Sequence, residues 1–194
     1  VAERLAGEGV KLNSFHTTAL CSPTRQALLT GRNHHVNRCA SITEGSNGFP
    51  GAAARLPAEC ATIGQVLQDN GFSTYWIGKN HNVPVEDISA CGNRSEWPLS
   101  KGFDRFYGFL GGETDQWAPL LIQDNTMIET PTRPGYHLTE DLADHAIGWL
   151  KKHQSYTPDK PFFIYFATGG AHGPHHVAPA WTAKYKGKLK PRLS

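Results

Sequence analysis

Two apolar runs, each following a predicted helix, constrain the fold of this chain more than any other feature. The nearly continuous apolar run Phe162 to Ala167 follows an amphipathic segment, Glu140 to His153, after Pro161. A second run, Phe72 to Gly78, is rich in aromatic residues, is bounded by glycine, and follows a shorter helix that begins after Thr62. Runs that are apolar at successive positions are typical of parallel strands, which are buried on both faces. The pattern predicts an α/β fold in which helices flank a mostly parallel central sheet, with the later run as a central strand.

Capping residues predict where these two helices begin and end. Thr62 and Gln65 have the spacing of a capping box, and Gly71 suits the left-handed position that follows a helix. Thr139 is expected to cap the later helix, Glu140 to His153. That helix has an acidic first turn and a basic last turn, which complement its dipole. Both helices are therefore expected to pack on the sheet.

The amino-terminal part is expected to contain two further helices and a strand. Helical turns are predicted from Val1 to Glu8, and a short strand near Val10 to Leu12. Ser22 then suits the N-cap of a second helix, and Pro23 suits its first position. Gly31 is expected to end that helix.

Cys21 and Arg25 lie at the start of this second helix and combine a nucleophile with an anion site. The free N–H groups of the first turn and the helix dipole favour an anion there. Arg25, one turn further, can lean toward the same anion with its planar guanidinium. Three residues separate the two, fewer than in the loop of a thiolate phosphatase. A buried free cysteine beside a capped helix is the structural alternative.

The residues Cys-Ser-Pro-Thr-Arg at 21–25, followed by Leu-Thr-Gly-Arg at 29–32, resemble the signature of the type I, formylglycine-dependent sulfatases. The resemblance is specific, because the Cys, Pro and Arg and the Thr-Gly-Arg tail fall in register. It implies an incomplete alkaline-phosphatase-like sandwich. It also implies a sulfuric ester hydrolase of arylsulfatase type, acting on a small-molecule sulfate ester. Cys21 would be oxidised to formylglycine by a formylglycine-generating enzyme, which is a maturation partner.

Further residues match that family in the expected order. Gly-Lys-Asn-His at 78–81 and Ala-His-Gly-Pro-His at 171–175 resemble its elements after two core strands. By this resemblance Lys79 binds sulfate, His81 hydrogen-bonds the formylglycine hydrate, and His172 contacts the ester oxygen and protonates the leaving alkoxide. Taken singly, the alternatives are a solvated strand end and satisfied loop histidines. Because the carboxyl ends of parallel strands meet at one edge, we expect these side chains to converge there.

The same resemblance implies a divalent cation, usually calcium, with the modified Cys21 among its ligands. The family's Asp and Asn ligands cannot be assigned to positions in this chain. We therefore interpret 1–185 as the amino-terminal part of a sulfatase catalytic domain with little or no activity by itself. The basic segment 186–194 is expected to be a disordered tail.

Other readings remain open beside this one. A phosphonate or phosphodiester hydrolase of the same superfamily would use the same machinery, and a non-catalytic remnant would keep the motif without activity.

The adjacent His34 and His35 make a poor zinc site, since neighbouring residues rarely point at one metal. A net charge of +2 gives no reason to expect a nucleic-acid partner. No run approaches the roughly 18 apolar residues of a membrane span. The sequence favours neither a cytoplasmic nor a periplasmic location.

Overall fold

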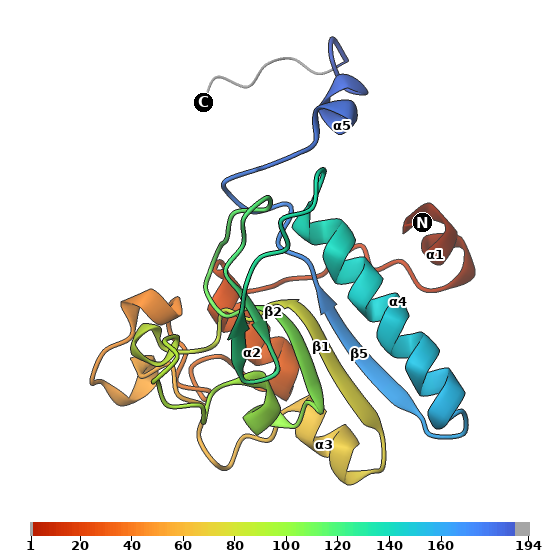
Figure 1. The fold of residues 1–194 in the computed structure, drawn as a ribbon. Coiled ribbons are helices and arrows are strands. Elements are labelled where there is room, and N and C mark those ends of the chain that lie inside the picture. Colours follow the sequence, from red (N-terminus) through yellow and green to blue (C-terminus); the bar gives the residue numbers. More distant parts are fainter. Residues whose placement is uncertain (1, 189–194) are drawn as a thin grey trace.

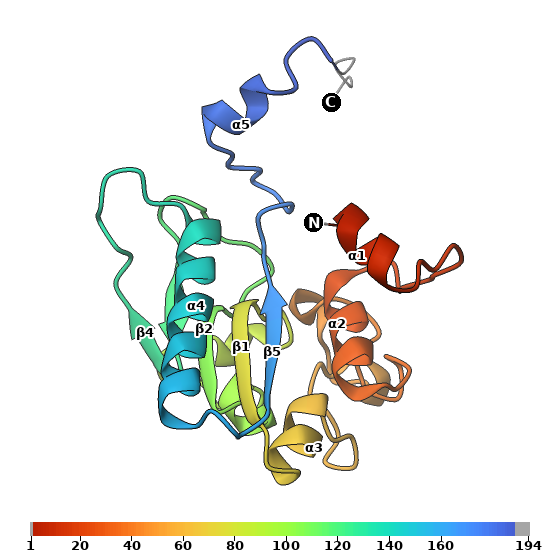
Figure 2. The ribbon, with the colours of Figure 1, turned by 90° about the vertical axis from the view of Figure 1, so that its right-hand side faces the viewer.

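The computed structural model of the protein describes residues 2–188, and within them the chain forms a five-stranded mixed sheet with helices on both faces. The strands run in the order β4-β3-β2-β1-β5. Figures 1 and 2 show α4 on one face of the sheet and α2 and α3 on the other. The helices are α1 (Ala2–Glu8), α2 (Cys21–Thr30), α3 (Ile63–Asp69), α4 (Leu138–Tyr156) and α5 (Pro179–Ala183). The strands are β1 (Ser73–Lys79), β2 (Arg105–Phe109), β3 (Leu121–Gln123), β4 (Thr126–Ile128) and β5 (Phe162–Ala167).

The parallel part of the sheet is the three-stranded unit β2-β1-β5. β1 pairs in parallel with β2 on one side and with β5 on the other, so that Gly78 is in register with both Gly108 and Ala167. β3 and β4 extend the sheet as an antiparallel hairpin beside β2. The predicted α/β class with helices flanking a central sheet is therefore confirmed, and the sheet is mixed, with its parallel part in β2-β1-β5.

Side chains that alternate between the two faces of the sheet form two separate hydrophobic cores. Trp76 of β1 and Phe106 of β2 point into the core beneath α2, where they pack with Leu29. Their neighbours Ile77 and Tyr107 point to the opposite face and pack against α4. Successive side chains of a strand face opposite sides, so β1 and β2 each contribute apolar side chains to both cores. The central strands are thereby held rigidly between the two helical layers.

A buried carboxylate also fastens α4 to the sheet. The hydroxyl of Tyr107 on β2 donates to Asp141 Oδ2 at 2.5 Å, and that of Tyr136 donates to the same oxygen at 3.1 Å. Burial raises the pKa of both tyrosines, and the Asp141 carboxylate raises it further. Asp141 is therefore a structural anchor of the helix and not part of the candidate site.

Several boundaries differ from the predictions, each for a local reason. Ser22 is not an N-cap: α2 already begins at Cys21, after Leu20, and the Ser22 side chain is buried, where its Oγ lies 3.4 Å from the Thr43 N–H. No strand forms near Val10 to Leu12, since those described residues are exposed and unpaired. α4 starts at Leu138, where the side chain of His137 accepts from the Thr139 N–H and so takes the capping role predicted for Thr139.

Further predictions concern the start of α3, the position of β5 and the carboxyl-terminal end of the chain. The capping box of Thr62 and Gln65 is confirmed. β5 has the predicted bounds, but among residues 2–188 it is an edge strand, so its predicted central position is wrong. Of the tail predicted for 186–194, positions 189–194 lie outside the described residues. No helix within 2–188 is long and apolar enough to cross a membrane.

Candidate active site

The site forms where β1 ends and the amino end of α2 approaches it. Gly78 allows β5 to pack closely against the end of β1. It has a φ of 108°, and a Cβ there would lie 2.1 Å from the carbonyl oxygen of Ala167. Only glycine tolerates that conformation and that contact. The close packing of β1 on β5 therefore fixes where the next residues, Lys79 and His81, leave the sheet.

His81 connects the candidate nucleophile to a carboxylate. Its Nδ1 lies 2.9 Å from Cys21 Sγ, and its Nε2 lies 2.8 Å from Glu44 Oε2. The His81 side chain is almost fully buried, whereas that of Glu44 is 44% exposed. A carboxylate on one ring nitrogen selects the tautomer with its proton on that nitrogen. Nδ1 of His81 is then a free acceptor that faces residue 21.

Burial, with help from two nearby cations, favours the neutral form of the His81 ring. Burial lowers the pKa of His81 and the cations of Lys79 and Arg25 lower it further, although Glu44 opposes them. Burial alone would raise the pKa of Glu44, but the hydrogen bonds from His81 and from a backbone N–H outweigh it and lower the pKa. The pair therefore consists of a neutral imidazole and a carboxylate. That arrangement suits a base which takes a proton from the group at position 21.

The backbone of His81 is held in an uncommon conformation. Its φ is +55°, in the left-handed region that few non-glycine residues adopt. Two hydrogen bonds support it by continuing the pairing beyond the ends of the strands: Asn80 N–H to Phe109 O and His81 N–H to Leu110 O, both 2.9 Å. Gly112 covers the ring, because a Cβ at that position would lie 2.7 Å from His81 Cε1. The orientation of His81 is thus set by the loop after β2.

Two cations stand beside Cys21. Lys79 is 2% exposed, and its burial lowers the pKa of its ammonium group. A negative charge on Cys21 would raise that pKa, whereas the nearby Arg25 lowers it. Arg25 Nη1 donates to the Lys79 carbonyl at 3.0 Å and so ties α2 to the end of β1. Two cations against the single carboxylate of Glu44 leave a net positive charge, which favours an anion next to residue 21.

Cys39 offers a contrast with Cys21. It is 1% exposed, and its Sγ donates to the carbonyl of Ser41 at 3.3 Å. Burial raises the pKa of Cys39 to about 12, and Cys21 adds to the rise. Since the thiolate is the reactive form of cysteine, Cys39 is inert and Cys21 is the candidate nucleophile.

The structure does not join His172 to this cluster. Its Nδ1 lies 3.0 Å from the carbonyl of Gly173 and 3.5 Å from Glu113 Oε2. No hydrogen bond or ion pair among residues 2–188 links His172 to Cys21. It nevertheless follows β5 at the same edge of the sheet, and Glu113 is the neighbour of the Gly112 that covers His81. The structure therefore brings Cys21, Arg25, Lys79 and His81 together, and the role expected for His172 stays a prediction.

Sequence reasoning missed Glu44. It lies on a short 3-10 turn, Thr43–Gly45, in a segment that reads as a glycine- and asparagine-rich loop. One signal was present, because Glu44 is the only acidic residue between Gly31 and Pro57.

The described part of the chain, 2–188, holds no group of three or more His, Cys, Asp or Glu side chains that could bind a metal ion. His34 and His35 contact each other, with ring centroids 4.1 Å apart, and gather no third ligand within that range. A divalent cation beside Cys21 would therefore need ligands other than those described here.

Comparisons with known proteins agree on one family. The sequence model named Sulfatase matches residues 2–192. The chain is 30% identical to arylsulfatase J of Mus musculus over 95% of its length, and 22% identical to an arylsulfatase of Klebsiella aerogenes over 97%. It spans 30% and 41% of those two relatives, respectively. Its fold is similar to that of the PsFucS1 sulfatase from Pseudoalteromonas sp., with a TM-score of 0.66 at 20% identity, over 96% of this chain and 40% of that one.

Proposed function

This chain belongs to the sulfatase family, and from that premise we propose that it is the nucleophile-bearing part of a sulfuric ester hydrolase that carries formylglycine at position 21. The observation that carries the proposal is the cluster around Cys21. It combines two cations, Lys79 and Arg25, with an imidazole that faces the sulfur and is backed by Glu44. A sulfate ester is an anion of the size and charge that such a cluster binds.

The aldehyde hydrate would supply two geminal hydroxyls, one to attack sulfur and one whose loss of a proton lets sulfate leave. The residues of the chain do the remaining work. Lys79 holds the sulfuryl oxygens, and the buried position of its ammonium strengthens that attraction. His81 Nδ1 accepts a proton from the group at position 21 while Glu44 holds the ring in place. His172 is proposed to protonate the leaving alkoxide.

A divalent cation, calcium by the family resemblance, is a separate proposal. Residues 2–188 do not provide a ligand set for it, so no step is assigned to it here. Without it, the negative charge of a bound sulfate rests on Lys79 and Arg25 alone. We therefore expect the chain by itself to bind a sulfate ester but to turn it over slowly or not at all.

Binding and turnover of a chromogenic aryl sulfate test the proposal. The chain is co-expressed with a formylglycine-generating enzyme, and the affinity of the ester is measured by competition with inorganic sulfate. We expect binding that is lost in Lys79→Met and kept in Lys151→Met, which removes an exposed lysine of α4. Binding that survives Lys79→Met would contradict the assigned anion site. Turnover at the rate of a complete sulfatase would contradict only the expected low activity.

A matched aryl phosphonate monoester separates sulfate from phosphonate hydrolysis. Both esters are monoanions of similar size, so the cluster alone discriminates weakly between them. Tighter binding of the sulfate would support the sulfatase assignment, and tighter binding of the phosphonate would favour the alternative.

A further inference from the structure

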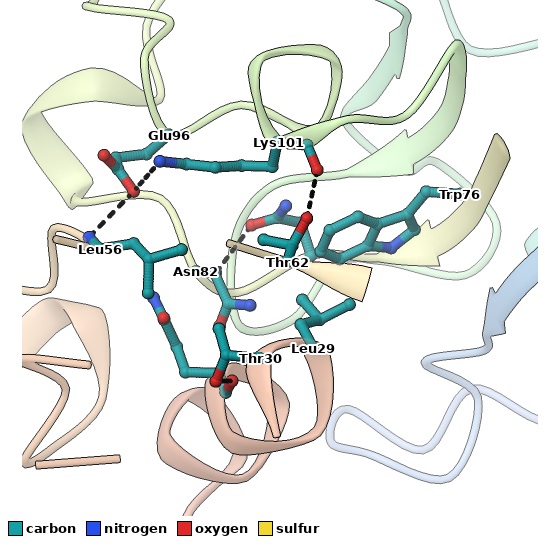
Figure 3. Close-up of a pocket in the computed structure, with 10 residues that line it drawn as sticks. Leu29, Thr30, Leu56, Thr62, Trp76, Asn82, Glu96 and Lys101 are labelled. Carbon is teal, nitrogen blue, oxygen red and sulfur yellow. Dashed lines mark hydrogen bonds and ion pairs between the residues drawn. The ribbon is translucent and has the colours of Figure 1, made fainter. Parts of the chain in front are cut away.

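A small cavity lies behind the candidate site, between α2 and the end of β1. Figure 3 shows its labelled lining: Leu29 and Thr30 approach from α2, Trp76 from β1, and Glu96 and Lys101 from the loops before β2. Asn80 and Asn82, which flank His81 in the sequence, also line it. The cavity leaves about 20 Å³ for the centre of a water molecule.

Two buried amide atoms in its lining have no hydrogen-bond partner among the described residues. They are Asn80 Nδ2 and Asn82 Oδ1, in side chains that are 1% and 6% exposed. The orientation of the first amide is fixed, because Asn80 Oδ1 already accepts from the Asn82 N–H at 2.7 Å. Nδ2 of Asn80 is therefore a donor without an acceptor. A buried polar atom left unpaired is costly, and native proteins seldom keep one.

The charged groups of the lining are already satisfied by each other. Glu96 Oε2 lies 3.0 Å from Lys101 Nζ and accepts from the Leu56 N–H at 3.2 Å. The charges of Glu96 and Lys101 neutralise each other, so the pair attracts neither a cation nor an anion strongly. Figure 3 shows this pair beside the cavity.

The occupant of the cavity follows from these requirements. A cation would face the N–H group of Asn80, and an anion would face the oxygen of Asn82, so either ion leaves one amide unpaired. A molecule that both accepts and donates satisfies the two amides together. Roughly 10–15 Å³ of such space holds one water, and the cavity exceeds that size only slightly.

We propose that this cavity is the binding site of one ordered water, which accepts a hydrogen bond from Asn80 Nδ2 and donates one to Asn82 Oδ1. The water fixes the segment 79–82 on the side away from Cys21. That segment presents Lys79 and His81 to the site, so the water acts as a positioning element behind them. The inference does not depend on the reaction proposed for position 21.

Two measurements on the chain test this inference. A high-resolution crystal structure should contain a density peak within hydrogen-bonding distance of both amide atoms. In solution, the side-chain NH₂ of Asn80 should show a nuclear Overhauser cross-peak at the water frequency. Asn82→Leu removes the acceptor at nearly constant size and should abolish the peak and the cross-peak. Asn70→Leu, which makes the same change at an exposed asparagine, should leave both in place.

A local readout separates positioning from a general loss of stability. In Asn82→Leu the backbone amides of Asn80 and His81 should exchange with solvent faster, while that of Trp76 in the middle of β1 keeps its protection. The inference is overturned if the wild-type chain shows no density peak, or if Asn80 Nδ2 bonds to a protein atom instead. It is also overturned if the cross-peak persists in Asn82→Leu. Should that variant not fold, the two wild-type measurements still decide.

Discussion

Replacing Glu44 by Gln should lower the pKa of His81, because it removes the negative charge that lies 2.8 Å from the His81 Nε2. A hydrogen bond to a charged group is worth about 1.5–3 kcal/mol when buried. The Glu44 side chain is 44% exposed, and solvent screening reduces this to about 1–1.5 kcal/mol. One pKa unit corresponds to about 1.4 kcal/mol, so the expected shift is roughly one unit downward.

The assay is a titration of the His81 ring signals by NMR in the wild type and in Glu44→Gln. His153, whose Nε2 lies 2.7 Å from the Lys160 carbonyl on the other side of the molecule, serves as an internal control that should not move. An unchanged or raised pKa of His81 in Glu44→Gln would refute the reasoning, because it would mean that the carboxylate does not act on the ring.

The same pair makes stability depend on pH in a defined direction. The folded-state pKa of His81 lies below its ordinary value of 6.5, so the unfolded chain binds more protons around and below that pH. The free energy of unfolding should therefore fall as the pH drops below about 6.5. Glu44→Gln, which lowers the folded-state pKa further, should enlarge that loss. Denaturant unfolding at pH 5 and pH 7.5 measures it.

Two further predictions concern the support of the site and of the sheet. Gly112→Ala places a methyl group 2.7 Å from His81 Cε1, whereas Gly111→Ala meets nothing closer than 3.7 Å. The first should weaken the contact of His81 with the thiol at position 21 and slow its alkylation by iodoacetamide, by roughly two- to tenfold for a bond worth about 0.5–1.5 kcal/mol. The second should not slow it, and equal rates would contradict the account. Asp141→Asn replaces the charged acceptor of two tyrosine hydroxyls by a neutral amide, whose oxygen accepts more weakly, and should cost about 1–3 kcal/mol. It should lower Tm by roughly 2–4 °C per kcal/mol, while the exposed Asp144→Asn leaves Tm nearly unchanged. A Tm for Asp141→Asn equal to that of Asp144→Asn would argue against the anchor.

The sequence predicted the elements whose residues follow a strong local rule. β1 and β5 were found because both of their faces are apolar, and α3 because Thr62 and Gln65 form its capping box. β3 and β4 were missed, since strands of three residues in a loop-rich region carry no period. The start of α2 was misplaced because Ser22, a good N-cap by type, is buried against Thr43, a contact distant in sequence.

The candidate site likewise contains residues that a local pattern indicates and residues whose positions depend on distant loops. Lys79 and His81 could be predicted, because they follow a parallel strand at the edge where ligands bind. Glu44 could not be assigned, since its contact with His81 depends on how the loop after α2 folds back. The pattern that identified His172 reports its order in the chain but not its distance from Cys21. That distance depends on the loops that follow β2 and β5.

Mass spectrometry of the peptide that contains Cys21 tests the central claim most directly. The chain is produced with and without a formylglycine-generating enzyme, and the peptide masses are compared. The account predicts that co-production lowers the mass by about 18 Da, as expected for conversion of the thiol to an aldehyde. It also predicts that the peptides holding Cys39 and Cys60 keep their thiol masses. An intact thiol at position 21 under both conditions would contradict it.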